Sequence, residues 1–180
     1  MTLRSRDRFD IIRALTAAGD PRAARLLKEQ SEADKTDDAR RYAFAAAAAE
    51  PTADVKKRYF GIYTTESKVA ESWIEASLGA FNTPRQSALT LPYLEPALRE
   101  LPTLKRTRKI FFVNGWLAAF IGGQCDERAA STVRDFLART PALDRDLRLK
   151  VLEADDGLER CVRVRARFAG EVPTAARRAP

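Results

Sequence analysis

Signals that start and stop helices recur along the whole chain, and no strand pattern competes with them. Amphipathic segments alternate with breaks rich in Gly, Pro and Asp, and helix pairs are expected to begin near residues 5, 36, 67, 105 and 143. Apolar residues spaced three or four apart indicate helices, whereas strands need strict alternation. The two hairpin-type dipeptides, Asn114-Gly115 and Asp156-Gly157, lie inside helical patterns. The sequence therefore predicts an all-α chain.

The spacing of the expected pairs narrows the architecture. Helix pairs that repeat every thirty to forty-odd residues are typical of HEAT- and armadillo-like arrays, the α-solenoids. A plain bundle is the alternative, because no repeat consensus recurs residue by residue. We expect one helical-repeat domain over residues 1–170 and a flexible tail over residues 171–180, which hold Pro173 and Pro180.

Capping residues and apolar spacing predict where several individual helices begin and end. Thr36 or Asp37 is expected to cap a helix, and Ser67 to cap another that carries Trp73. One long apolar helix is expected from Lys105 to Ile121. Two further helices are expected over residues 127–139 and 144–168, the second with a break at Gly157.

The chemistry open to the chain is limited by its lack of histidine. A Ser-His-Asp triad, a Cys-His pair and a His-ligated catalytic zinc all need imidazoles. Cys125 and Cys161 are far apart in the sequence and form no CxxC motif, so both are expected to be reduced thiols of a cytoplasmic protein. Neither a signal peptide nor a membrane span is expected, since the longest apolar stretch is shorter than the roughly 18 residues that a span needs.

Positive charge is the chain's other compositional feature. The formal net charge is +7, and 24 of the 32 basic residues are Arg. Lys105, Arg106, Arg108 and Lys109 form a cluster at the start of the expected long helix. Nucleic-acid binding, a solvated helix start and docking onto an acidic surface are the three interpretations. No nucleic-acid-binding motif accompanies the cluster, so we expect no nucleic-acid partner.

Three motifs resemble a known family. They are Trp73-Ile74-Glu75-Ala76-Ser77-Leu78-Gly79-Ala80-Phe81-Asn82 with Pro84-Arg85, then Leu91-Pro92-Tyr93-Leu94, then Lys105 to Trp116 with its Phe residues. Together they are similar to the C-terminal helical domain of the aminopeptidase N family of zinc aminopeptidases. The Asp37-Asp38-Ala39-Arg40 segment with Tyr59-Phe60 resembles the preceding helix pair. The resemblance spans roughly residues 37–168 and is most specific between Trp73 and Arg85.

The resemblance implies a part of an enzyme. In that family a separate catalytic domain carries H-E-x-x-H and the zinc, while the C-terminal domain caps the active site and lines the peptide cavity. This chain has no H-E-x-x-H, so it is expected to hold neither metal nor cofactor and to be inactive alone. The partners implied are the catalytic domain of the same polypeptide and peptide substrates. An independent helical-repeat scaffold that binds another protein is the alternative.

Three polar residues are candidates for the peptide cavity or for contact with the catalytic domain: Asn82, Arg85 and Asn114. Asn82 follows a helix and is also a candidate cap in the left-handed conformation. Arg85 is expected in a first helical turn, where a cation opposes the helix dipole, so a carboxylate partner is expected. That partner is either Glu75 within the domain or a group on the peptide or the catalytic domain.

Overall fold

The computed structural model describes residues 3–65 and 68–169, and these form helices and short connections without any strand. The all-α prediction is therefore confirmed for the part of the chain that is described. The helices are α1 (Ser5–Ala17), α2 (Ala23–Ala33), α3 (Asp37–Ala48), α4 (Ala53–Thr64), α5 (Glu71–Phe81), η1 (Pro84–Gln86), α6 (Ser87–Thr90), η2 (Leu91–Tyr93), α7 (Leu94–Arg99), α8 (Leu101–Thr107), α9 (Ile110–Phe120), α10 (Glu127–Arg139) and α11 (Arg145–Phe168).

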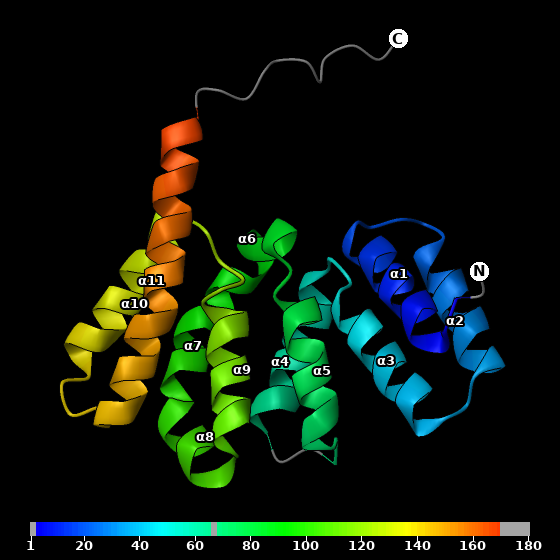
Figure 1. Ribbon diagram of the computed structural model, residues 1–180, viewed down its shortest axis with the longest axis horizontal. Coiled ribbons are helices and arrows are strands. Elements are labelled where there is room, and N and C mark those ends of the chain that lie inside the picture. Colours follow the sequence, from blue (N-terminus) through cyan, green and yellow to red (C-terminus); the bar gives the residue numbers. More distant parts are fainter. Residues whose placement is uncertain (1–2, 66–67, 170–180) are drawn as a thin grey trace.

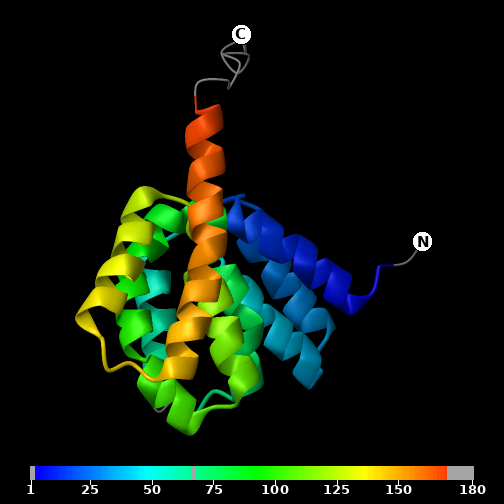
Figure 2. The same cartoon turned by 60° about the vertical axis from the view of Figure 1, so that its left-hand side comes forward.

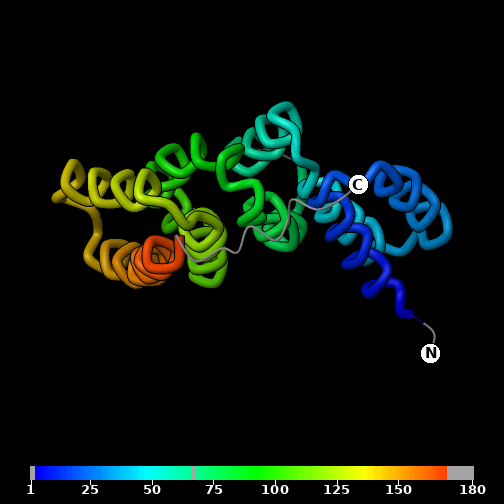
Figure 3. Tube along the Cα trace, turned by 90° about the horizontal axis from the view of Figure 1, so that it is seen from above, coloured from blue at the N-terminus to red at the C-terminus, as the bar shows by residue number. Residues whose placement is uncertain are grey.

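The helices lie in two rows. One row runs α3, α5, α9, α11, each helix packed against the next, with α1 beside α3 at the far end (Figure 1). The other row holds α4, α6, α7 and α10 (Figure 3). The chain passes between the rows from α3 to α5 and again from α9 to α11, whereas α6 and α7 follow each other within the second row (Figure 3).

Neighbouring helices of the first row are parallel. Arg108, just before α9, pairs with Glu71 at the start of α5 at 3.2 Å. At the other end, Gly123, just after α9, lies so close to Asn82 that an added Cβ would be 2.5 Å from the Asn82 carbonyl oxygen. The C-terminal ends of these helices therefore lie along one edge of the molecule.

Two buried side chains hold this edge together. Lys56 Nζ donates to the carbonyl oxygens of Ala48 and Phe81, at 2.8 and 2.9 Å. Gln86 Nε2 donates to the carbonyl oxygens of Ala17 and Ala49, at 2.9 and 2.7 Å. The last carbonyls of a helix have no partner within it, so each donor satisfies groups at the ends of two helices. Burial lowers the pKa of Lys56 to about 8.

Apolar residues form one large core and one small one. The large core lies between the rows and is rich in aromatic rings, with Trp116 1% exposed and its Nε1 donating to the Ala97 carbonyl oxygen at 3.0 Å. The small core joins α1 to α3 through Phe9, Ile12, Ala39 and Ala46. Alanines of α3 allow the helices on either side to approach closely, as the run of alanines in the sequence suggests.

Several local expectations are corrected. The segment from Lys105 to Ile121 is two helices, because Arg108 and Lys109 are extended (ψ 162° and 155°), which lets α8 and α9 both turn apolar side chains into the core. No break occurs at Gly157, since Leu158 and Asp155 beside it are buried and keep α11 continuous. Thr36 caps α3, as expected, by accepting from the Ala39 N–H at 3.2 Å.

Two expectations fall outside the described residues. Ser67 is one of them, and α5 itself begins at Glu71 with Ala70 as its N-cap residue. The tail expected over residues 171–180 is the other.

Candidate functional site

Asn114 lies on the outer face of the first row, beside two adjoining hollows. The hollow between α5 and α9 has a volume of about 310 Å³, and the hollow between α9 and α11 has a volume of about 280 Å³. Ala118 lines both. We call this surface the α9 face and define it by its lining residues Glu75, Gly79, Phe111, Asn114, Gly115, Ala118, Lys150 and Glu153.

The α9 face is apolar and low in relief. Phe111 is 78% exposed, although α9 buries Phe112, Trp116 and Phe120 on its opposite side. Gly79 and Gly115 have open space where a Cβ would be. Small residues around an exposed aromatic ring leave room for another chain to lie flat against α5 and α9.

Charges frame the α9 face. Glu75, Lys150 and Glu153 line its hollows, and none of the three forms an ion pair with any residue in the described ranges. The Asn114 side chain is exposed and, within those ranges, has no hydrogen-bond partner. An amide group can both donate to and accept from a peptide backbone. The arrangement can therefore bind an extended chain.

Asn82 does not belong to a surface. Its side chain is 2% exposed, and its Nδ2 donates to the Leu78 carbonyl oxygen at 3.2 Å. It is the C-cap residue of α5, but its φ of −96° shows that the cap is not left-handed. The cap interpretation of Asn82 is supported, whereas the close packing of Gly123 against it leaves no space for a ligand there.

Arg85 is exposed, and it makes no ion pair with Glu75 or with any other described residue. The argument for a carboxylate partner assumed a helix dipole that Arg85 opposes. Arg85 lies instead in the three-residue helix η1, which has no appreciable dipole. It also follows the C-terminal end of α5, where a cation is favourable. The expected pair with Glu75 is therefore not formed.

Two of the four residues of the basic cluster form ion pairs within the described part of the domain. Lys105 contacts Asp144 and lies 3.5 Å from Asp146, and Arg108 pairs with Glu71. These carboxylates lie on α5 and at the start of α11, so the cluster joins α8 and α9 to their neighbours. The acidic surface that one interpretation required is supplied, in part, by the chain itself.

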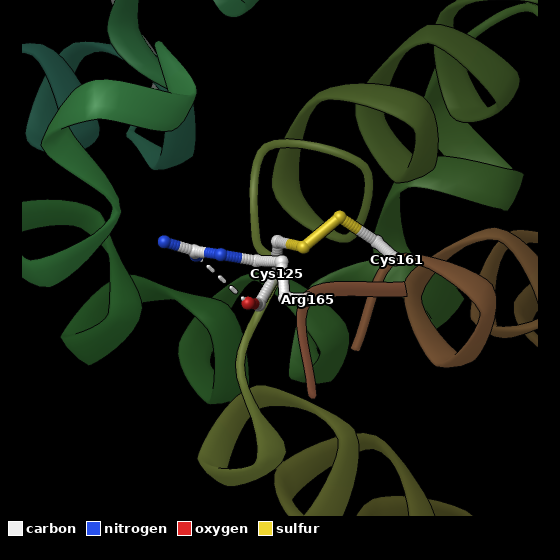
Figure 4. Close-up of a disulfide and its surroundings, with 3 residues drawn as sticks. All are labelled: Cys125, Cys161 and Arg165. Carbon is white, nitrogen blue, oxygen red and sulfur yellow. Dashed lines mark hydrogen bonds between the residues drawn. A yellow bond between two sulfur atoms is a disulfide. The ribbon is translucent and has the colours of Figure 1, made fainter. Parts of the chain in front are cut away.

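The expectation about the cysteines is wrong. Cys125 and Cys161 form a disulfide, with their Cα atoms 5.4 Å apart (Figure 4). Arg165, one turn further along α11, donates from Nη1 to the Cys125 carbonyl oxygen at 3.0 Å. The parallel packing of α9 and α11 brings together two cysteines that are 36 residues apart in the sequence. Reduced thiols were the argument for a cytoplasmic protein, and that argument no longer applies.

Two further properties concern membranes and metals. Among the described residues, no helix has the length and apolar character to cross a membrane. The same residues contain no group of three or more His, Cys, Asp or Glu side chains placed to hold a metal ion.

Comparisons with known proteins do not identify a family. No family model matches the chain, and no curated protein matches it. The resemblance to the aminopeptidase N family therefore remains a prediction from the motif residues.

Sequence reasoning missed three features of this molecule. Lys56 and Gln86 carry no motif, and only the helix ends around them reveal their roles. Phe111 lies in one of the three motifs. Nearly every residue of α9 is apolar, so the sequence does not show which of its aromatic rings face solvent.

Proposed function

We propose that this chain is the C-terminal helical domain of a zinc metallo-aminopeptidase of the aminopeptidase N type. The domain caps the active site of the catalytic domain in the same polypeptide and lines the cavity that holds the peptide. It contributes no catalytic residue, and the zinc belongs to the catalytic domain. The α9 face is the surface turned toward the peptide.

The helix arrangement supports a HEAT-like array for this domain. Contacts between neighbouring helices, or the segments beside them, recur at a similar interval along the chain: Glu71 and Arg108 are 37 residues apart, and Cys125 and Cys161 are 36 residues apart. A recurring interval between parallel, side-by-side helices is the geometry of an α-solenoid. Such arrays bind extended partners along one face.

The exposed Phe111 is the observation that carries the proposal most directly. A ring this exposed costs solvation free energy that only an occupied face recovers. Gly79, Gly115 and Ala118 leave a shallow floor beside it, and Asn114 supplies the polar group that orients a peptide. Arg85 is a second candidate contact, for a carboxylate of the peptide or of the catalytic domain.

The test uses the polypeptide of the full reading frame, in which we expect an H-E-x-x-H motif before residue 1. Phe111→Asp should lower kcat/KM for peptides of four or more residues by about tenfold, with little effect on a single-residue chromogenic substrate, since only remote contacts are lost. Ala138→Asp, an exposed change on α10, is the control.

The opposite results would count against the proposal. A reading frame without H-E-x-x-H would favour the alternative, an independent helical-repeat scaffold. Equal losses on short and long substrates would show that the α9 face does not meet the peptide.

A further inference from the structure

The disulfide joins a fixed segment to the end of a long helix. The fixed segment is the α9–α10 connection that carries Cys125. Gly123 packs against Asn82, and the buried Gln124 donates from Nε2 to Thr90 Oγ1 at 2.9 Å. Two contacts with different helices therefore hold this connection whether or not Cys125 is bonded.

The other partner lies where α11 leaves the body of the protein. Leu147, Val151 and Leu158 are buried, and Val162 packs partly against the core. From residue 163 to residue 169 every side chain is exposed. In Figures 1 and 2, α11 extends past the ends of its neighbours. Cys161 thus ties down α11 at its last buried turns.

The end of α11 has few other attachments. Beyond the disulfide, Arg165 donates a hydrogen bond from residues 163–169 to the α9–α10 connection, and Arg163 pairs with Glu159 within α11 itself. Val162 and Val164 are β-branched and favour helix less than straight-chain residues. A helix end that lacks packing frays easily, because propensity alone barely sustains a short helix in water.

The bond is open to attack. Both cysteines are half-buried, and a hollow of about 640 Å³ lies beside Cys125, lined also by Asp126, Val162, Arg165, Ala166, Phe168 and Ala169. A thiol-bearing reductant can therefore approach the bond from the Cys125 side without unfolding the core. The guanidinium of Arg165 borders the same hollow and favours an approaching thiolate.

We propose that the Cys125–Cys161 disulfide is a thiol-exchange site that controls the order of the last two turns of α11. A dithiol reductant is the co-reactant. Its thiolate attacks one sulfur, the Cys125–Cys161 bond breaks, and a mixed disulfide forms. Its second thiol then displaces the protein sulfur, giving two cysteine thiols and the oxidised, disulfide form of the reductant. Two electrons and two protons pass from the reductant to the protein.

Hydrogen exchange of the whole chain, followed by mass spectrometry, tests the proposal. After dithiothreitol treatment, amides of residues 162–168 should exchange about tenfold faster or more, whereas residues 145–158 should be unchanged. The Cys125→Ser/Cys161→Ser variant should show the fast exchange from the start and should not respond to dithiothreitol.

Arg165→Ala separates the covalent link from the hydrogen bond. In the oxidised chain this variant should keep most of the protection of residues 162–168. Three results would overturn the proposal: two titratable thiols per chain after treatment with oxidised glutathione, unchanged exchange on reduction, or faster exchange throughout the chain. Loss of protection in oxidised Arg165→Ala as large as that on reduction would also overturn it.

Discussion

Replacing Gln86 with Glu tests how the C-terminal edge of the helix row is held. The change keeps the size of the side chain but removes its donor. Both contacts of Nε2, at 2.9 and 2.7 Å, are with carbonyl oxygens, so a carboxylate would face two acceptors. The site is 5% exposed, which keeps water from replacing the lost donor.

The expected loss follows from the two carbonyls of Ala17 and Ala49. A buried carbonyl left without its donor costs about 1–3 kcal/mol, so two cost about 2–6 kcal/mol. A charge placed against two helix C-termini adds to this loss. For a domain of this size, the melting temperature should fall by roughly 5–20 °C. Such a loss is a large part of a typical stability of about 5–15 kcal/mol.

Urea unfolding followed by tryptophan fluorescence measures the effect. Gln86→Met removes the same donor without adding charge, so it should cost about 2–6 kcal/mol at every pH. Gln86→Glu should cost more at pH 8 than at pH 4, where a buried carboxyl group is protonated and can donate once. Gln30→Glu, on the partly exposed α2, is the surface control. A Gln86→Glu variant within about 0.5 kcal/mol of the wild type at pH 8 would refute the reasoning.

Three further predictions concern other buried positions. Because burial lowers the pKa of Lys56 to about 8, the free energy of unfolding should rise by about 1–3 kcal/mol between pH 8 and pH 10. Lys56→Met should abolish this rise, whereas Lys57→Met, at an exposed position, should keep it. Burial raises the pKa of Asp155, so the protein loses stability as pH rises through that pKa and the buried carboxyl group ionises. Asp155→Asn should therefore raise the urea midpoint at pH 7. If the increase in the urea midpoint were as large below pH 4, this cause would be contradicted. Gly123→Ala should lower the melting temperature, since its Cβ would lie 2.5 Å from a backbone oxygen, whereas Gly115→Ala, in open space within α9, should raise stability by about 0.5–1 kcal/mol; equal effects would show that the close approach is absent.

The sequence predicted what depends on local periodicity. The helices after Thr36 and over residues 127–139 follow from capping residues and apolar spacing and lie where expected, and the apolar spacing around Trp73 predicts a helix whose start, at Glu71, is later than Ser67 suggested. The break predicted at Gly157 does not occur, because the low helix propensity of glycine is a weak preference and the buried side chains beside it keep α11 intact. Tertiary packing decides such cases.

The errors at the candidate site have one physical origin. The cysteine pairing, the environment of Arg85 and the outward position of Phe111 all depend on which helices lie side by side. Spacing along the chain does not contain that information. Asn114 is exposed beside a hollow, and its polar side chain on an otherwise apolar helix was a local signal of that exposure.

The division into a large and a small core has a consequence for cooperativity. α1 and α2 contact the rest of the protein mainly through α3, and their shared core consists of a few side chains around Phe9 and Ile12. In a linear array, each unit is stabilised only by its neighbours. We therefore expect the first two helices to open at a lower free energy than the helices around Trp116.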